Sequence, residues 1–274
     1  GGTALSKCYR IIERFSEDID LVTLRVEEET GAQLKKKLKE IYNPVNVIMP
    51  EVDLPGVTNK RGMIRKTAHE YPKAFKGLYG QVRDKVIIEA SWLGHYEPYH
   101  SRGINSYIYD MMLGKEQHAL IKEYEMDPFT VQVLDIKRTL CEKILSLVRF
   151  SYTENPISDL KMKIRHLYDL HQLLAKPEIQ EFLDSVEFEA MLNRVGEDDL
   201  EGYRSNNDWL VHHPSEAMIF NKPEEVWHEL ERTYTNDFKG LVFGHFPVSD
   251  QVLSSLNVLS QRIKGISWNV KKAE

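Results

Sequence analysis

Cysteine is nearly absent from this chain, with only Cys8 and Cys141 among 274 residues. Both lie in apolar, helix-prone surroundings, which predicts buried thiols in a reducing compartment. Two cysteines are also too few for a thiolate metal site. Long apolar runs are missing as well, because VIIEASWL and LVFGHFPV fall far short of the roughly 18 residues that span a bilayer. We therefore expect a cytoplasmic protein with no membrane partner.

Internal repeats and low-complexity tracts are missing too. What is present is the composition of a soluble globular protein, with 42% apolar and 28% charged residues. The length allows one large domain or two ordinary ones.

The stretch that organises the chain is the first, GGTALSKCYRIIERFSEDIDL. Gly1 and Gly2 would let the backbone approach a phosphate, and a helix predicted over residues 3–13 would direct its N-terminal N–H groups toward it. Thr3 is a candidate N-cap for that helix. The stretch therefore opens with a candidate phosphate-binding turn.

Two aspartates follow at the end of the same stretch. Asp18 and Asp20 stand two apart on a predicted strand, so their side chains leave by one face, about 6.6 Å apart. Carboxylates at that spacing can share two Mg²⁺ ions that promote in-line attack on a phosphoryl group. Taken singly, an Asp-x-Asp pair is common on surfaces and a glycine pair is usually a turn. Here the glycine pair comes first, a stretch long enough for a helix follows, and the aspartate pair comes last. This combination favours a phosphate- and metal-binding site.

Gly1-Gly2-Thr3 followed by Asp18-Ile19-Asp20 resembles the signature of the DNA polymerase β-like nucleotidyltransferase superfamily. The fuller strings GGTAL and RFSEDIDL resemble the AbiEii/AbiGii toxin family within it, which includes the MenT-type toxins. The resemblance implies Mg²⁺- or Mn²⁺-dependent transfer of a nucleoside monophosphate from an NTP to an acceptor. It also implies a toxin neutralised by a separately encoded antitoxin, and some relatives modify the acceptor end of tRNA.

The same resemblance assigns roles near the N-terminus. Gly1, Gly2, Thr3 and Lys7 are expected to contact the nucleotide, and Asp18 and Asp20 to be catalytic metal ligands. In the resembled family a helix and a strand precede the glycine pair, and this chain opens on Gly1 rather than methionine. We therefore expect a native segment ahead of it, whose nature, including a signal peptide, stays open.

A third carboxylate follows a predicted strand, KVIIEASWL, over residues 85–93. Val86 to Ile88 should be core, and the acid directly after them, Glu89, matches the third metal ligand that a polymerase β-like site needs. The alternative is a strand-end glutamate in solvent.

Two predicted helices in the second half carry further site residues. TLCEKILSL resembles the family's second motif, so Lys143, beside a stripe of Leu140, Ile144 and Leu147 or Val148, is expected to contact the nucleotide. RHLYDL resembles a later motif and assigns the site-lining residues Arg165, His166 and catalytic Asp169. Periodicity puts Leu160, Ile164, Leu167, His171 or Leu170, and Leu174 on the buried face of this helix and places Arg165 and Asp169 on the other face. Periodicity alone therefore favours an i, i+4 ion pair between Arg165 and Asp169, and it leaves His166 as a helical histidine or a proton acceptor.

The net charge of −6 conceals a basic segment. Residues 35–85 carry 12 lysines and arginines against five acids, a local +7, which leaves −13 for the rest. LKKKLKE is best explained as a solvated helix face. The remaining basic residues predict an RNA-binding surface, with tRNA as the first candidate: Lys60, Arg61, Arg65 and Lys66, extended by Lys73 and Lys76.

The predicted fold class is α+β: a mixed polymerase β-like sheet in residues 1–136 and an α-helical domain in residues 137–274. The other predicted strands cover residues 18–25 and 129–136, and the other predicted helices cover residues 30–42 (ended by Asn43-Pro44), 104–125, 137–150, 158–175, 178–184, 186–194, 223–238 and 248–264. Two rival functions stay open: a small-molecule nucleotidyltransferase, and a catalytically silent nucleotide- or partner-binding protein.

Overall fold

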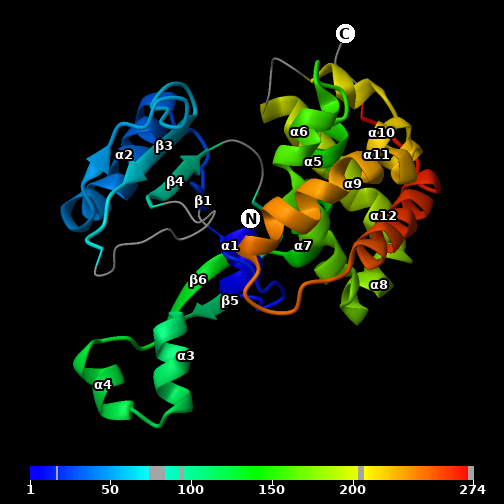
Figure 1. The fold of residues 1–274 in the computed structure, drawn as a ribbon. Coiled ribbons are helices and arrows are strands. Elements are labelled where there is room, and N and C mark those ends of the chain that lie inside the picture. The colour runs from blue at the N-terminus through cyan, green and yellow to red at the C-terminus, as the bar shows by residue number, and fades with distance from the viewer. Residues whose placement is uncertain (17, 74–83, 93–95, 203–206, 271–274) are drawn as a thin grey trace.

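The strand predicted from KVIIEASWL lies inside a four-stranded mixed sheet of an α+β protein, which confirms the predicted fold class (Figure 1). The computed structural model describes residues 1–16, 18–73, 84–92, 96–202 and 207–270. The sheet order is β1-β4-β3-β2, in which β1 runs parallel to β4 and the other pairs are antiparallel. The strands are β1 (Asp18–Val22), β2 (Glu51–Val52), β3 (Ile64–His69) and β4 (Val86–Ser91).

Helix α2 (Gly31–Ile48) covers one face of this sheet because its apolar stripe packs on alternate residues of β4. Leu34, Leu38 and Tyr42 form a cluster with Ile88 and Ala90. Glu89 lies between Ile88 and Ala90 on β4, so its side chain points to the opposite face of the sheet.

The expected end of this helix at Asn43-Pro44 is wrong, since α2 contains Pro44 and continues to Ile48. The carbonyl that a proline leaves without an amide partner belongs to Glu40, which is exposed, so water can satisfy it. Val45 packs against the cluster under the sheet, and this burial favours continuation of the helix.

A β-hairpin, β5 (Tyr99–Ile104) and β6 (Phe129–Leu134), carries a helical arm that projects from the body in Figure 1. The arm contains α3 (Tyr107–Gly114) and α4 (His118–Glu123), so the region expected to be helical over residues 104–125 forms two short helices. The sequence did not reveal β5 because YHSRGI lacks apolar alternation, and backbone pairing with β6 defines it.

The second half of the chain is helical, as expected, with α5 (Ile136–Phe150) at its centre. Leu140, Ile144 and Leu147 are fully buried there. Instead of one helix over residues 158–175, the chain forms α6 and α7, because Lys163 between them leaves helical geometry at φ −101°, ψ 12°. The helices are α6 (Pro156–Met162), α7 (Ile164–Leu174), α8 (Pro177–Leu183), α9 (Val186–Gly202), α10 (Met218–Asn221), α11 (Pro223–Arg232) and α12 (Ser249–Lys264), with a π-helical turn at Thr233–Phe238 and 3₁₀ turns at Asp208–Val211, Pro214–Glu216 and Lys239–Leu241.

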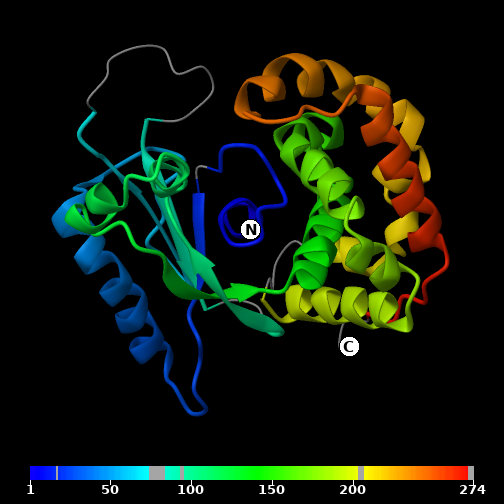
Figure 2. The same ribbon diagram turned by 90° about the horizontal axis from the view of Figure 1, so that it is seen from below.

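The N-terminal segment lies between the sheet and the helical body (Figure 2). Its helix α1 (Gly2–Lys7) is shorter than the 3–13 expected, and Leu5, Ile11 and Ile12 belong to the helical core. This segment therefore connects β1 to the helices, and the domain division at residue 136 stays a prediction.

Candidate functional site

The face of the sheet that α2 leaves uncovered carries the three acids singled out in the sequence. Asp18 and Asp20 lie two apart on β1, and the parallel register places Asp20 opposite Glu89 on β4. Across the antiparallel pair, Lys66 on β3 lies opposite Glu89 and its Nζ is 2.8 Å from Glu89 Oε2. The predicted third acid is thus a cross-strand neighbour of the Asp pair.

A cavity of about 370 Å³ adjoins this face. Asp20 and Glu89 both line it, together with Gly1, whereas Asp18 is not among the described residues on its wall. The remaining lining residues are Leu21, Val22, Leu24, Ser91, Tyr96, Tyr99, Gln132, Leu134 and Glu142. The cavity therefore lies between the sheet, the hairpin and α5.

The glycine pair allows close packing at the mouth of this cavity. A Cβ atom on Gly1 would collide with the Asp20 carboxylate, and one on Gly2 would lie 2.6 Å from Arg14 Nη2. Thr3 is not the N-cap of α1, since the helix already begins at Gly2; its hydroxyl donates to the Asp18 carbonyl at 2.5 Å. The first turn of α1 is thereby tied to the start of β1.

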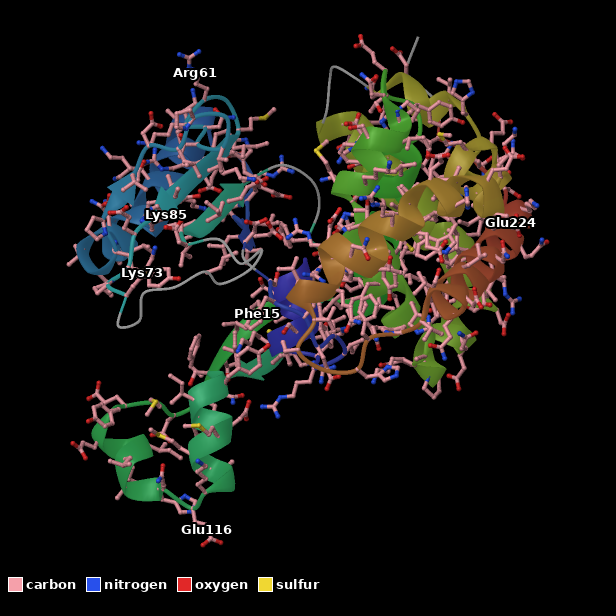
Figure 3. The ribbon with its side chains drawn as sticks, in the orientation of Figure 1. Phe15, Arg61, Lys73, Lys85, Glu116 and Glu224 are labelled. Carbon is pink, nitrogen blue, oxygen red and sulfur yellow. The ribbon has the colours of Figure 1, made fainter. Side chains whose placement is uncertain are left out.

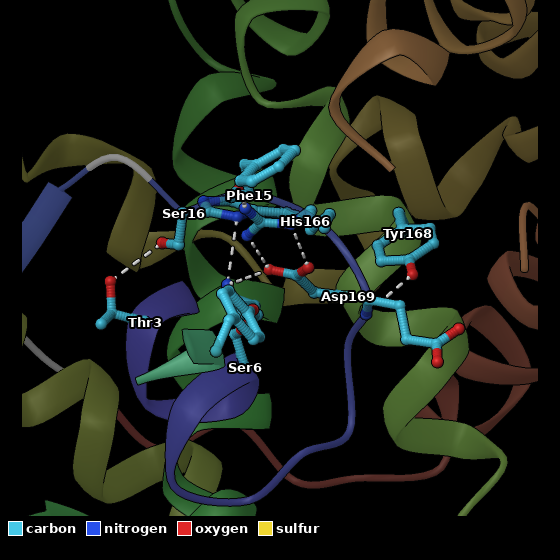
Figure 4. Close-up of polar contacts among 11 residues, drawn as sticks. Thr3, Ser6, Phe15, Ser16, His166, Tyr168 and Asp169 are labelled. Atoms are coloured by element: carbon cyan, nitrogen blue, oxygen red, sulfur yellow. Dashed lines mark hydrogen bonds and ion pairs between the residues drawn. The ribbon is translucent and has the colours of Figure 1, made fainter. Parts of the chain in front are cut away.

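A second centre is built around Asp169 of α7 (Figure 4). Arg14 binds its carboxylate in bidentate fashion, with Nε–Oδ1 and Nη2–Oδ2 both at 2.7 Å, and Lys143 Nζ is 2.8 Å from Oδ2. Asp169 has no exposed surface, and Arg14 and Lys143 are 3% and 5% exposed. The expectation that Asp169 faces away from the core is therefore wrong, because two buried cations from other segments neutralise it.

Charges decide the protonation states in this centre. Burial alone would raise the pKa of Asp169, but Lys143 and Arg14 outweigh it and hold the pKa far below its usual range. Burial alone would lower the pKa of Arg14, whereas Asp169 and, less strongly, Asp18 raise it. Burial and the Lys143 charge hold the pKa of His166 well below its usual value, so His166 is neutral near pH 7.

His166 and Arg165 of α7 complete the predicted set on the helical side. His166 Nδ1 lies 3.4 Å from Lys143 Nζ, close enough for a neutral ring to accept from the ammonium. Arg165 is near Lys163, whose pKa is lowered by burial and by the charges of Arg149, Arg165 and Lys66. Glu89 lies in the same region, and its negative charge acts to raise the pKa of Lys163.

Other predicted site residues lie away from the cavity. Lys7 Nζ sits 2.9 Å from the centre of the Tyr107 ring, in a second pocket of about 160 Å³ that Asp110 and Phe243 also line. Phe15, labelled in Figure 3, packs against Phe243 of this pocket with ring centres 5.4 Å apart.

The basic segment extends over the sheet lobe, where Figure 3 places Arg61 and Lys73. Its cations are largely paired with acids: Lys60 and Arg65 with Glu51, Lys66 with Glu89, and Lys73 with Asp84. Arg61 is exposed, and Lys76 lies outside the described residues.

Three residues of the site were missed in the sequence. Arg14 opens RFSEDIDL, with Ile12 two residues before it and Phe15 directly after it, and an arginine so close to apolar residues could have signalled a buried ion pair. Glu142, directly before Lys143, reaches the cavity from α5. Lys163 lies at the break between α6 and α7, where the charge of Glu89 acts on it, and no local pattern in the sequence marks it.

The donor set fits a hard divalent cation in the type of its ligand atoms. Mg²⁺ prefers carboxylate oxygens, and Asp20 and Glu89 face one cavity from neighbouring strands. Across the described ranges no three His, Cys, Asp or Glu side chains converge closely enough to hold an ion, and Glu89 is paired with Lys66. Binding would require Glu89 to exchange that partner.

Comparison with known proteins gives one match. A family model described as "Nucleotidyl transferase AbiEii toxin, Type IV TA system" matches residues 1–254. No match was found among curated proteins or among solved structures. In the described part of the chain, none of the helices has the length and apolar character needed to cross a membrane.

Proposed function

The chain belongs to the AbiEii nucleotidyl transferase toxin family, and from this premise we propose that it transfers a nucleoside monophosphate from an NTP to an RNA acceptor, releasing pyrophosphate. The observation that supports the proposal best is the cavity shared by Asp20, Glu89 and Gly1. A carboxylate pair beside a glycine-flanked helix start combines metal-ligand and phosphate-binding chemistry in one place.

The proposed roles rest on the positions of Asp20 and Glu89 in the cavity and, for Asp18, on its place two residues before Asp20 on β1. Asp18, Asp20 and Glu89 would hold Mg²⁺ or Mn²⁺, which when bound neutralises phosphate charge and activates the acceptor hydroxyl. Lys66, released from Glu89, would be free to approach a phosphate oxygen. Metal binding by Glu89 on β4 and release of Lys66 on β3 would therefore occur together.

On the helical side, Lys143 and Arg14 both form ion pairs with Asp169. Because Arg14 alone already satisfies both carboxylate oxygens, Lys143 can turn its ammonium to a triphosphate while Asp169 stays compensated. Neutral His166 accepts from Lys143 and adds no competing charge. Arg165 would contribute a further cation to the same anion.

The acceptor is proposed from charge. Residues 35–85 carry a local +7 in a chain of net −6, and a polyanion is the acceptor class that such a segment favours. The pairing of Lys60, Arg65, Lys66 and Lys73 with acids weakens that attraction and favours the second candidate, a small-molecule acceptor. We further propose a cytoplasmic location and a cognate antitoxin, which the type IV toxin–antitoxin description of the family implies.

The test is incubation with each α-labelled NTP, Mg²⁺ and total cellular RNA, followed by gel analysis and pyrophosphate measurement. Label on an RNA band together with pyrophosphate supports the proposal. Pyrophosphate release without RNA favours a small acceptor, and NTP binding without pyrophosphate release indicates a silent binding protein.

A further inference from the structure

The cavity wall opposite the sheet comes from the hairpin, from residues just before it and from α5. It includes Tyr96 and Tyr99, Gln132, and Glu142. Glu142 brings a carboxylate to the side of the cavity facing Asp20 and Glu89, although the cavity is expected to receive a polyanion.

A buried arginine fixes Glu142 in this position. Arg138 Nε donates to Glu142 Oε1 at 3.1 Å, and the Arg138 side chain is 2% exposed. Arg138 is itself held by Asp198 Oδ2 at 2.5 Å and by the Glu97 carbonyl at 3.1 Å. The Glu142 side chain remains 38% exposed, so its carboxylate is oriented and still accessible from the cavity.

The chemistry of a carboxylate limits what Glu142 can bind. An ionised carboxylate only accepts hydrogen bonds, and it repels phosphate oxygens. The ligand atom must therefore be a donor, and a nucleotide offers its ribose hydroxyls and its base amino groups.

The hairpin register separates these two possibilities. Tyr99 pairs with Leu134, two residues before α5 begins, and Ser101 pairs with Gln132 two residues farther away. Moving away from α5, the wall therefore offers first an aromatic ring and then an amide, whose Nε2 donates to Ser101 Oγ at 2.9 Å. A ring suits base stacking and an amide suits a base edge, which places the sugar next to α5.

We propose that Glu142 is a specificity-determining residue that accepts hydrogen bonds from the ribose hydroxyls of the nucleotide. The base stacks on Tyr99 and presents its edge to Gln132. Arg138 is a positioning residue that acts through Glu142. This inference rests on the proposed function and adds to it a preference for ribonucleotides over deoxyribonucleotides.

The test is equilibrium dialysis of each NTP and its 2′-deoxy and 3′-deoxy forms, with Mg²⁺, against the full chain. A hydrogen bond to a charged group predicts that the wild-type protein prefers NTP over dNTP by about 10- to 100-fold. Glu142→Ala should bring that ratio close to one, while Glu224→Gln, an exposed acid on the far side of the helical body (Figure 3), should leave it unchanged. If the alanine variant does not fold, Glu142→Gln, which keeps an acceptor for Arg138, should lower the ratio by about threefold to tenfold.

The outcomes separate the two levels of the proposal. Absence of NTP binding by the wild-type protein contradicts the proposed function itself. Equal binding of NTP and dNTP by the wild-type protein overturns only the ribose assignment. A preference that survives in Glu142→Ala, or a variant that alters only discrimination between bases, overturns it as well.

Discussion

Asp20 lies beside Glu89 in the cavity and carries the negative charge on which the proposed transfer reaction depends most. Asp20→Asn keeps the shape of the side chain but removes a negative metal ligand, so we expect NTP-dependent transfer to fall by about two to four orders of magnitude. Stability should not decrease, because fewer like charges remain beside Glu89. Transfer rates at saturating Mg²⁺ and urea unfolding of the same preparations measure both effects.

Asp127→Asn is the matched control, since Asp127 is exposed and does not line the cavity. Its transfer rate should equal that of the wild-type protein. Near-native transfer by the Asp20 variant would show that the metal-ligand role is wrong.

Asp169 gives a prediction about stability and pH. Its carboxylate compensates two buried cations, so Asp169→Asn should lower the free energy of unfolding at pH 7 by about 3–5 kcal/mol. The pKa of Asp169 is depressed in the folded state relative to roughly 3.9 in the unfolded chain, so its contribution is fully present above about pH 5. It is lost as the pH falls through the folded-state value.

Urea unfolding at pH 7, 5 and 3 measures this dependence. The difference between wild-type and Asp169→Asn proteins should be constant from pH 7 to 5 and shrink by pH 3. A difference that grows on acidification would mean that Asp169 is not held ionised by Arg14 and Lys143.

At the scale of elements, α2 and the sheet depend on each other. Tyr42 Oη accepts from the Ala90 amide at 2.9 Å and donates to the Arg65 carbonyl, so one side chain joins the helix to β4 and β3. Burial raises the pKa of Tyr42 to about 12, which keeps the hydroxyl a donor at any physiological pH. Helix α2 therefore fixes β4 from the face opposite the one that carries Glu89.

Pro44 tests how this helix tolerates an interior proline. Pro44 is exposed, and replacing it restores an amide donor for the Glu40 carbonyl, so Pro44→Ala should raise the free energy of unfolding by about 1–3 kcal/mol. Asn43→Ala at the adjacent exposed position should change it by less than about 0.5 kcal/mol. A destabilised Pro44→Ala variant in urea unfolding would show that the helix needs the proline.

At the scale of the whole molecule, charge is unevenly distributed and partly compensated. Lys66 and Arg65 are engaged by Glu89 and by Glu51, which leaves Lys60 and Arg61 as the better probes of an RNA surface. Lys60 pairs with Glu51 but is half exposed, and Arg61 points outward from the sheet lobe in Figure 3.

Replacing Lys60 and Arg61 together with serine should weaken RNA binding and flatten its salt dependence. Each lost phosphate contact removes about 0.7–0.9 from the slope of log affinity against log salt, so the slope should fall by about 1.5. Lys115 and Lys122, exposed on the arm, provide the control pair and should leave the slope unchanged on substitution by serine. Fluorescence anisotropy with tRNA at several salt concentrations measures it, and an unaltered slope in the first variant would place RNA elsewhere.

The sequence by itself determined the features that depend on near neighbours. The Asp18–Asp20 spacing on one strand face, the apolar stripe of α5 and the α+β class all follow from periodicity and local propensity. Its errors were local as well: Pro44 did not end α2, and the polar strand β5 has no pattern of its own.

Only the tertiary structure decided which distant charges meet. Arg14 and Asp169 are 155 residues apart, and a contact over that separation has no periodicity by which it could be recognised. Likewise, Glu142 is an ordinary helical glutamate in sequence, and the packing of α5 beside the hairpin brings it to the cavity wall. Burial turned these residues into ion pairs and oriented acceptors, because a charge removed from water must find a partner in whichever segment folds against it.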